Sequence, residues 1–312
     1  MTCDHAGTGD RRPDRIVVGL VAAAAILAGC VPHQGQLASP GPAVQTPQWR
    51  LVEDIRYVPA DWPEPLTGDL FLPDGPASPP VVLLVHGGGW EGGEPENLVS
   101  IAERLVRRGY AVFNVQYRLA PEYEFPAPVH DLQMAVRWLR TQSQAYDLQT
   151  DHIAGFGYSA GAHLVLMLGL ISDGDALDSP WGGAETRLQA VVAGAGPTDL
   201  RKFEGGRLVP QFLGSSLQAA PELFAMASPV THVDEGDPPV FVYHGGLDWL
   251  VSVDHARDLK TALDAAGVPA ELYVSRWLGH ISLFLFDGGA VAAATDFLDA
   301  TLRSEASAKA IE

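Results

Sequence analysis

The sequence predicts an α/β fold in which a mostly parallel central sheet carries helices on both faces. Strand-like and helix-like segments alternate from residue 81 onward, which is the order that a parallel sheet requires. The aliphatic run at residues 81–85 is typical of a strand buried on both faces. The chain has 312 residues, of which 47% are hydrophobic and 19% charged, so it can bury the core of one large domain.

Local patterns place the individual elements along the chain. Residues 50–57 and 66–73 alternate apolar and polar side chains as edge strands do, and Pro73-Asp74-Gly75 ends the second strand. Later segments are either short aliphatic runs or longer stretches with apolar residues at helical spacing. Further strands are expected at 81–85, 111–117, 152–156, 188–195, 240–244 and 270–274. Helices are expected at 101–108, 129–142, 160–171, 254–266 and 290–302.

Residues 197–237 interrupt this alternation. They mix charged residues, glycine and proline with the scattered aromatic residues Phe203, Phe212 and Phe224. Since ligands of such sheets bind at the carboxyl ends of the strands, we expect a short lid-like insertion over that end. The folded domain is expected to span residues 49–304, followed by a tail at 305–312.

The first thirty residues have the pattern of a bacterial lipoprotein signal peptide. Three arginines precede an apolar run at residues 16–28, which is too short to span a membrane comfortably. The run ends in Leu27-Ala28-Gly29-Cys30, which resembles the lipobox, whose cysteine becomes the lipidated first residue of the mature protein. The alternative is a signal peptide cleaved nearby, with the cysteine incidental.

We therefore expect a signal peptide at 1–29, a flexible tether at 30–48 and a lipid anchor at Cys30 that holds the protein in the cell envelope. Val31 stands where an aspartate would resemble an inner-membrane retention signal, which favours an outer membrane where the cell has one.

Charge and cysteine content exclude several classes of function. A net charge of −18 argues against a nucleic-acid partner, because phosphates require basic patches. The two cysteines, Cys3 and Cys30, leave no disulfide in the mature domain. The histidines are dispersed and lack partners at ligand spacing, so neither a metal nor another cofactor is expected. The sequence leaves the oligomeric state open.

The segment Gly-Tyr-Ser-Ala-Gly at residues 157–161 is the candidate catalytic motif. It fits G-x-S-x-G, the strand-to-helix turn that lifts a serine, here Ser159, to the top of an α/β-hydrolase sheet. Glycines flank the serine because so sharp a reversal leaves no room for side chains. A small-residue turn without chemistry is the alternative, so the motif needs partners elsewhere in the chain.

A candidate oxyanion hole follows the aliphatic run at 81–85. The glycines of His-Gly-Gly-Gly-Trp at 86–90 let the backbone approach a ligand, and their N–H groups can point at a developing oxyanion together with that of Ala160. A phosphate-binding loop is the alternative, but no G-K-[ST] follows.

The acid of a serine triad should come after the serine in the chain. Asp248 follows the strand at 240–244 through two glycines, where a carboxylate can face a histidine from the strand tip. Asp199 occupies a similar place after an earlier strand but leads into the insertion. Asp234 and Asp237 fall in a loop. We therefore favour Asp248 over the other three.

The base should follow the acid. His280 is expected in a loop after the last strand, beside Gly279, where its ring is free to reach over the sheet. The alternatives are His232, His244, which ends a strand and is expected to satisfy backbone groups, and His255, which opens a helix and is expected to be exposed. His163, behind the nucleophile, is expected to be structural. An ion pair between Arg118 and Asp131 is expected to hold loops together rather than to bind substrate.

These motifs together resemble the hormone-sensitive-lipase and acetyl-esterase branches of the α/β-hydrolases. The resemblance rests on HGGGW at 86–90, YRLAPE at 117–122 with FPA at 125–127, GYSAG at 157–161, and GH at 279–280. The segment 157–164 is also similar to arylformamidases and to bacterial feruloyl/acetyl-type carboxylesterases. The resemblance implies Ser159 as nucleophile, His280 as base, Asp248 as acid, and Gly88, Gly89 and Ala160 as oxyanion donors.

The expected activity is that of a serine hydrolase that cleaves short-chain or aryl carboxylic esters through an acyl-enzyme. Two alternatives stay open, namely an arylformamidase-type amide hydrolase and a catalytically silent binding protein of the same fold. Trp90, Tyr158 and Trp249 are the candidate pocket residues. Tyr158 departs from the aspartate usual in the hormone-sensitive-lipase branch, and Trp249 is expected either to narrow the pocket or to pack.

Overall fold

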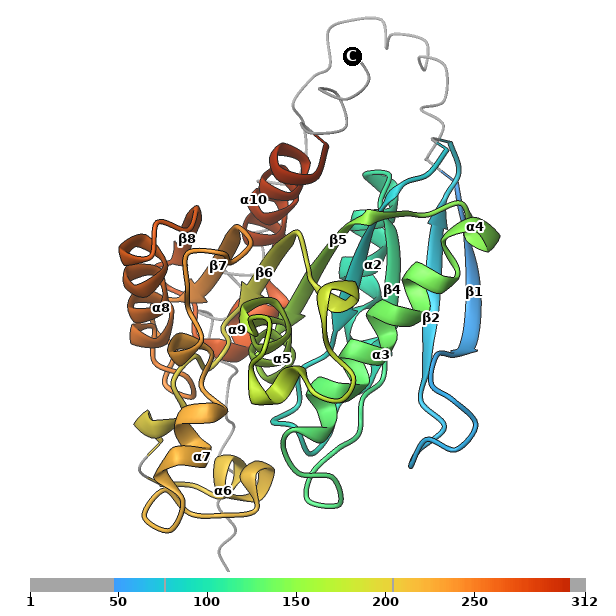
Figure 1. Cartoon of the computed structure of the whole chain (residues 1–312). Coiled ribbons are helices and arrows are strands. Elements are labelled where there is room, and N and C mark those ends of the chain that lie inside the picture. The colour runs from blue at the N-terminus through green and yellow to red at the C-terminus, as the bar shows by residue number, and fades with distance from the viewer. Residues whose placement is uncertain (1–47, 76, 204, 304–312) are drawn as a thin grey trace, which may run out of the picture. The chain divides into compact units, whose positions relative to one another are not determined.

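The computed structural model describes residues 48–303 except 76 and 204, and these residues are organised around one eight-stranded sheet (Figure 1). The expected signal peptide, the lipidation site Cys30, the tether up to residue 47 and the tail at 305–312 lie outside the described residues. None of the helices formed by the described residues is long and apolar enough to cross a membrane.

The sheet is parallel except at one edge. Its spatial order is β1-β2-β4-β3-β5-β6-β7-β8; β1 pairs with β2 and β2 with β4 in antiparallel fashion, and all other neighbours are parallel. The strands are β1 (Trp49–Arg56), β2 (Thr67–Pro73), β3 (Pro80–Val85), β4 (Ala111–Val115), β5 (Gln149–Tyr158), β6 (Ala190–Gly194), β7 (Val240–Gly245) and β8 (Ala270–Ser275).

The helices alternate with the parallel strands. The main ones are α2 (Val99–Arg107), α3 (Ala127–Thr141), α5 (Ala160–Leu170), α8 (Asp254–Ala265), α9 (His280–Leu285) and α10 (Gly288–Leu298). Shorter ones are α4 (Ser143–Tyr146), α6 (Leu208–Leu213) and α7 (Pro221–Met226), with single turns η1 (Pro95–Leu98), η2 (Ala176–Asp178), η3 (Ala184–Thr186), η4 (Leu200–Lys202), η5 (Pro229–Thr231) and η6 (Asp299–Arg303).

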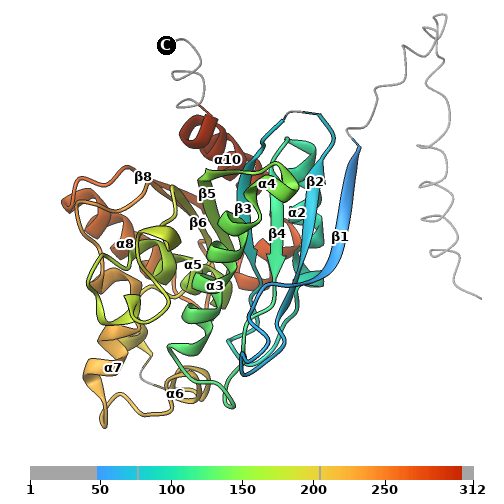
Figure 2. The same ribbon diagram turned by 45° about the vertical axis from the view of Figure 1, so that its right-hand side comes forward.

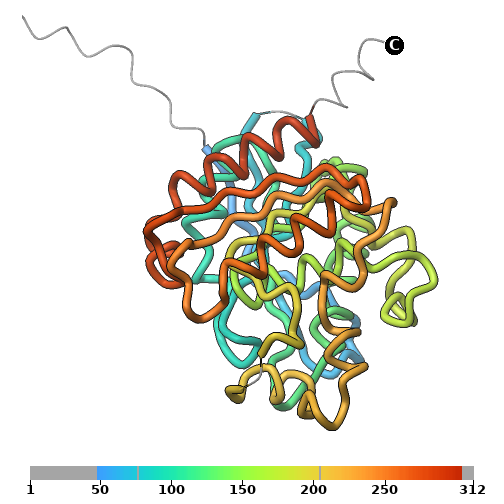
Figure 3. Tube along the Cα trace, turned by 90° about the vertical axis from the view of Figure 1, so that its left-hand side faces the viewer, coloured from blue at the N-terminus to red at the C-terminus, as the bar shows by residue number. Residues whose placement is uncertain are grey.

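Two apolar layers cover the two faces of the sheet. Side chains alternate along β3, so that Val81, Leu83 and Val85 face one layer while Val82 and Leu84 face the other. Helices α3, α5 and α8 pack on the first face, and α2, α9 and α10 pack on the second (Figures 1 and 2). Viewed from the β8 edge, α8 and α10 lie on opposite sides of the strands (Figure 3). The predicted helix-covered, mostly parallel sheet is therefore confirmed.

The expected elements recur with shifted ends, and the short helices α4, α6, α7 and α9 were not expected. β5 is the longest strand because it begins at Gln149 and continues to Tyr158, directly before the candidate nucleophile. The insertion at 197–237 contains η4, α6, α7 and η5, and it lies beyond the carboxyl ends of the strands (Figure 1). Helix α9 was expected to be a loop. Its six residues are too few to show a helical period, which is why the sequence pattern did not reveal it.

Candidate active site

Ser159 lies on a sharp turn between β5 and α5, with a backbone φ of +54° that L-residues rarely adopt. The chain can reverse there because glycines stand on either side. A Cβ on Gly157 would lie 2.3 Å from the carbonyl carbon of Gly161, and a Cβ on Gly161 would lie 2.1 Å from the carbonyl oxygen of Val85. The Ser159 N–H donates to the Gly194 carbonyl at 2.7 Å, which fixes the turn against β6.

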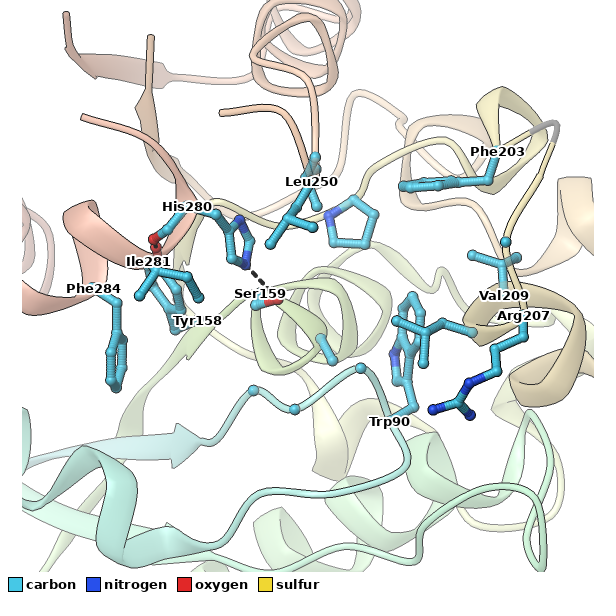
Figure 4. Close-up of a pocket in the computed structure, with 18 of the residues that line it drawn as sticks. Trp90, Tyr158, Ser159, Phe203, Arg207, Val209, Leu250, His280, Ile281 and Phe284 are labelled. Atoms are coloured by element: carbon cyan, nitrogen blue, oxygen red, sulfur yellow. Dashed lines mark hydrogen bonds between the residues drawn. The ribbon is translucent and has the colours of Figure 1, made fainter. Parts of the chain in front are cut away.

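Three side chains from separate segments of the chain meet at this turn. His280 Nε2 lies 2.9 Å from Ser159 Oγ (Figure 4), and His280 Nδ1 lies 2.7 Å from Asp248 Oδ2. With Nδ1–H donating to the carboxylate, Nε2 is left as the acceptor for the serine hydroxyl proton. Asp248 and His280 are both largely buried. The structure thus brings together the three residues that the sequence singled out, at the distances that proton transfer requires.

The carboxylate of Asp248 is held from both sides. Its Oδ1 accepts the N–H groups of Leu250 and Val251, both at 2.9 Å, which leaves Oδ2 for His280. Burial alone would raise the pKa of Asp248, but the hydrogen bonds from His244, His280 and Val251 outweigh it and hold that pKa well below its usual range. Asp248 therefore stays ionised, as a group that orients an imidazole and stabilises its charged form must.

His280 is the first residue of helix α9, so the prediction that it lies in a loop is wrong. Gly279 caps this helix: its N–H donates to Ser282 Oγ at 2.8 Å, and its carbonyl accepts the Leu283 N–H at 2.8 Å. At the other end, Asp287 forms a bidentate ion pair with Arg104 of α2. The histidine is thus carried by a short helix tied down at both ends.

Tyr158 ties the nucleophile to the base. Its hydroxyl donates to the His280 carbonyl at 2.6 Å, across the gap between the end of β5 and the start of α9. Burial, and then the charges of Asp248 and Asp287, raise the pKa of Tyr158, so the hydroxyl remains protonated and can donate. Tyr158 also lines the cavity described below, as expected of it, but its contact with His280 is a role that no motif indicated.

The glycine loop after β3 approaches the serine from the opposite side. Gly88 and Gly89 have φ values of +118° and +62°, which glycine adopts readily. The carbonyl of Gly88 accepts the N–H groups of Glu91 and Gly92, so the loop closes on itself. In the part of the chain that the structure describes, the N–H groups of Gly88, Gly89 and Ala160 donate to no protein acceptor. Three unused donors beside a serine can bind an oxyanion.

Side chains behind the loop hold it in place. His86 Nδ1 lies 2.7 Å from the Gly87 carbonyl, and the imidazole stacks on Tyr117 at 4.3 Å between ring centroids. Trp90 stacks on Phe212 at 4.5 Å, and its indole N–H donates to His163 Nδ1 at 3.2 Å. His163 in turn bonds the Ala227 carbonyl, so it serves structure, as expected.

An apolar cavity of about 490 Å³ opens above Ser159 (Figure 4). The glycine loop and Ser159 form its floor. Trp90, as expected, and Asn97 and Leu98 of η1 line it on one side, and the rest of its walls comes from three later segments, namely the insertion, the turn after Asp248, and α9. The residues that line these walls are Pro197, Phe203, Gly205, Gly206, Arg207, Leu208, Val209, Leu250, Val251, Ile281 and Phe284. The predicted insertion thus supplies one wall of the cavity, opposite α9.

Arg207 is the one cationic side chain among the residues that line the cavity, and it is already paired. Both terminal nitrogens of its guanidinium contact the carboxylate of Glu91, which also accepts from Gln211. The arrangement latches the insertion to the glycine loop and leaves the cavity without a free charge to select an ionic substrate.

Two expectations about individual residues are wrong. Trp249 does not line the cavity; it is 83% exposed, because the two N–H groups that grip Asp248 turn the neighbouring side chain outward. His255 is buried rather than exposed, because its Nδ1 accepts the N–H groups of Thr198 and Asp199 beneath the insertion.

The remaining candidates lie away from the serine. Asp199 pairs with Arg201, and His232 bonds Asp175 and the Met226 carbonyl. Asp234 and Asp237 border a different cavity. His244 Nε2 donates to the Val251 carbonyl at 2.8 Å, which is the backbone role expected of it, and it also lies 3.4 Å from Asp248 Oδ2, so this histidine borders the acid of the triad.

Arg118 and Asp131 form the expected buried ion pair. Within the described ranges, no group of three or more metal-ligating side chains is arranged to hold a metal ion.

The rest of the cavity wall escaped the sequence reasoning. Leu250, Ile281 and Phe284 are close in sequence to Asp248 and His280, so proximity to the acid and base was the one signal that could have found them. Phe203 and Leu208 belong to the insertion, where irregular sequence gives no period from which to infer direction.

A family model, BD-FAE, matches residues 69–263, which is more than half of the chain and includes Ser159 and Asp248. Esterase LipC of Mycobacterium tuberculosis is 29% identical over 272 residues, covering 82% of this chain and 67% of that protein. Esterase LipQ of the same organism is 31% identical over 201 residues, covering 62% of this chain and 48% of LipQ. The chain therefore spans about half the length of LipQ.

Solved structures share the fold. A truncated carbohydrate esterase from gut microbiota superposes with a TM-score of 0.72 at 24% identity, covering 84% of this chain and 99% of that one. The butyrate-bound Est2 esterase of Thermogutta terrifontis superposes with a TM-score of 0.66 at 22% identity, covering 82% and 95%. At these identities the superpositions establish an α/β-hydrolase fold for the chain.

Proposed function

We propose that this chain, which belongs to the BD-FAE family of α/β-hydrolases, hydrolyses uncharged carboxylic esters through an acyl-enzyme on Ser159. One observation carries the proposal. A continuous hydrogen-bonded series runs from Asp248 through His280 to Ser159, and three unused backbone donors stand beside the serine at the floor of an apolar cavity. Nucleophile, base, orienting acid and oxyanion hole are the parts that acyl transfer needs.

The reaction follows from these positions. His280 Nε2 takes the proton of Ser159 Oγ as that oxygen attacks the acyl carbon, and the carbonyl oxygen becomes an oxyanion held by the N–H groups of Gly88, Gly89 and Ala160. The protonated imidazole, stabilised by Asp248, returns the proton to the leaving alcohol. A water molecule activated by His280 then attacks the acyl-enzyme, and the carboxylic acid leaves as Ser159 is restored.

The cavity favours small uncharged substrates. Its walls are mainly apolar, and Arg207 is engaged by Glu91, so neither side of the ester gains from carrying a charge. About 490 Å³ is within the range of sites that take drug-sized ligands, which suits a short acyl chain or an aryl group. The substrate class that we propose is therefore short-chain or aryl esters.

Replacement of the nucleophile tests the proposal. We expect Ser159→Ala to lower kcat for p-nitrophenyl acetate and butyrate on the order of 10⁴-fold or more and to abolish labelling by a fluorophosphonate. Ser100→Ala, at an exposed serine of α2, is the matched control and should behave as the unsubstituted protein. Full hydrolysis and labelling by Ser159→Ala would refute the proposal.

The same assay separates the alternatives. The proposal requires the acetyl ester to be hydrolysed faster than an N-formyl aryl amide. The reverse order would indicate an arylformamidase-type enzyme. A protein that neither reacts with the fluorophosphonate nor hydrolyses any ester or amide of the panel would be the silent binding protein.

We further propose that Cys30 carries the lipid that anchors the protein in the cell envelope. The support is the lipobox-like sequence after an apolar run of signal-peptide length. Feeding an alkyne fatty acid to producing bacteria should label the full chain and leave Cys30→Ser unlabelled. Equal labelling of both would contradict the anchor.

A further inference from the structure

Large apolar side chains stand exposed around the loops that deliver the acid and the base. Trp249 is 83% and Trp277 73% exposed, and Leu247, Leu250, Ile281 and Leu285 are between 43% and 66% exposed. We call these six residues the apolar rim. Single exposed apolar residues are common on protein surfaces, but several neighbouring ones mark a binding surface.

The rim is one surface, although its residues come from three segments. The turn after β7 is joined to the turn after β8 by two backbone hydrogen bonds, from the Leu247 N–H to the Leu278 carbonyl and from the Gly246 N–H to the Ser275 carbonyl, both 2.9 Å. Helix α9 starts directly after the second turn. Ile281 and Leu285 are four residues apart on that helix, so they project from the same face.

The rim is continuous with the cavity above Ser159. Leu250 and Ile281 belong to both and are partly exposed, and Figure 4 shows them on opposite sides of His280. Whatever covers the rim therefore also covers the mouth. A second copy of the chain seated there would obstruct substrate entry, whereas a phase that itself contains the substrate would supply it.

The segments that carry the apolar rim contain far fewer charged residues than the rest of the chain. The sequence holds 38 acidic residues and a net charge of −18. In residues 244–253 and 275–286, by contrast, the charged side chains are Asp248, which is buried, and Arg276, whose guanidinium stacks on Trp277. These two segments carry no exposed carboxylate, so they can enter an apolar phase without burying one. Tryptophan is favoured at such boundaries because its ring is apolar and its N–H stays hydrated.

We propose that the apolar rim docks on the surface of a zwitterionic lipid phase, from which esters enter the cavity. Docking itself depends only on the rim. The entry of esters rests on the proposed function. The acidity of the rest of the chain predicts weaker binding to anionic lipid, since like charges repel near such a surface.

Vesicles that cannot be hydrolysed test docking separately from catalysis. The mature chain, which starts at residue 30, carries Cys30→Ser throughout, so that neither the apolar run at 16–28 nor an acyl anchor contributes. Its co-sedimentation with ether-linked phosphatidylcholine vesicles is measured. Trp277→Ser and Leu285→Ser, singly and together, are compared with Leu51→Ser, an exposed leucine on β1 at the opposite edge of the sheet. Neither Trp277 nor Leu285 lines the cavity.

We expect each rim substitution to lower the vesicle partition coefficient roughly tenfold, in line with the loss of one buried apolar side chain, and Leu51→Ser to leave it unchanged. Hydrolysis of dissolved p-nitrophenyl acetate should stay within about twofold in all variants, while hydrolysis of an emulsified short-chain ester, tributyrin, should fall with binding.

Three results would overturn the docking proposal: no sedimentation of the parent protein, equal sedimentation of parent and rim variants, or a dimer in light scattering that the rim substitutions dissociate. Binding that depends on the rim, without hydrolysis of any ester, would uphold docking and contradict the proposed function alone.

Discussion

The floor of the cavity is formed mainly by closely packed backbone, whereas its walls are formed by side chains. The floor consists of the nucleophile turn and the glycine loop, where backbone packs on backbone so closely that a single Cβ at Gly161 would lie 2.1 Å from the Val85 carbonyl oxygen. The walls consist of side chains from the insertion, the turn after β7 and α9, and several of them are half exposed. The floor therefore tolerates few substitutions and fixes the reacting groups. The walls tolerate many substitutions and set the selectivity for substrates.

Replacement of the acid by its amide should have the largest effect, because Asp248 orients the base that acts on the nucleophile of the floor. In Asp248→Asn, Oδ1 can still accept the Leu250 and Val251 N–H groups, but the amide NH₂ would face His280 Nδ1 and favour the wrong tautomer. We expect kcat for p-nitrophenyl acetate to fall about 10⁴-fold with the unfolding temperature nearly unchanged. Thermal unfolding followed by circular dichroism serves as the control. A loss below tenfold would show that the triad is less strictly constrained than we infer.

Acid should destabilise the floor through His163. Burial, opposed in part by the bond to the Ala227 carbonyl, lowers the pKa of His163 to about 4 from an ordinary value near 6.5. The folded protein thus keeps this ring neutral while the unfolded chain protonates it, so its contribution to stability is full above about pH 6.5 and is lost as the pH falls through about 4. The shift corresponds to about 3 kcal/mol.

Urea unfolding between pH 7.5 and 4.5 measures this contribution. The slope of the unfolding free energy against pH reports how many protons are taken up on unfolding. This number should be smaller by up to one in His163→Gln than in the unsubstituted protein. His255, whose pKa burial also lowers to about 4, keeps part of the slope in both proteins. Identical slopes would mean that the ring takes up its proton without unfolding the region.

The link between Tyr158 and His280 lies at the boundary of floor and wall. Tyr158→Phe removes the hydrogen bond to the His280 carbonyl, and a net loss of about 1 kcal/mol in the positioning of the base predicts a kcat about fivefold lower, with KM unchanged. Tyr243→Phe is the matched control, since its buried hydroxyl has no partner among the described residues and its ring lies 6.1 Å from that of Tyr158. Equal kcat values in the two variants would assign Tyr158 to packing alone.

The difference between floor and walls explains which parts of the fold and the site could be predicted from the sequence. The fold followed from strand–helix alternation, and Ser159, Asp248 and His280 followed from motif and chain order, because tight turns and strand tips restrict sequence strongly. The position of Asp248 could be inferred from the strand before it. The hydroxyl of Tyr158 could not be placed, because its partner is a carbonyl 122 residues away.

The walls were harder to infer for the same physical reason. Trp249 was expected near the pocket because it follows the acid, but the direction of a side chain in a turn depends on backbone hydrogen bonds that the sequence does not display. His255 was expected to be exposed because it opens a helix, yet the insertion folds over it. Irregular segments carry no period, so burial within them is decided by tertiary contacts.

Truncation of a wall residue should have the smallest effect and the most selective one. Leu208 belongs to α6 of the insertion, lines the cavity and is 39% exposed. In Leu208→Ala we expect KM for p-nitrophenyl hexanoate to rise roughly threefold to tenfold through lost apolar contact, while kcat and the kinetics of the acetate stay unchanged. Leu285→Ala, which removes a leucine outside the cavity, should alter neither substrate when both are dissolved. Leu208 Cδ1 lies 3.1 Å from the place that a Cβ on Gly89 would occupy. If Leu208→Ala lowered kcat for acetate and hexanoate alike, the insertion would be positioning the glycine loop, and the division between floor and wall would fail at that point.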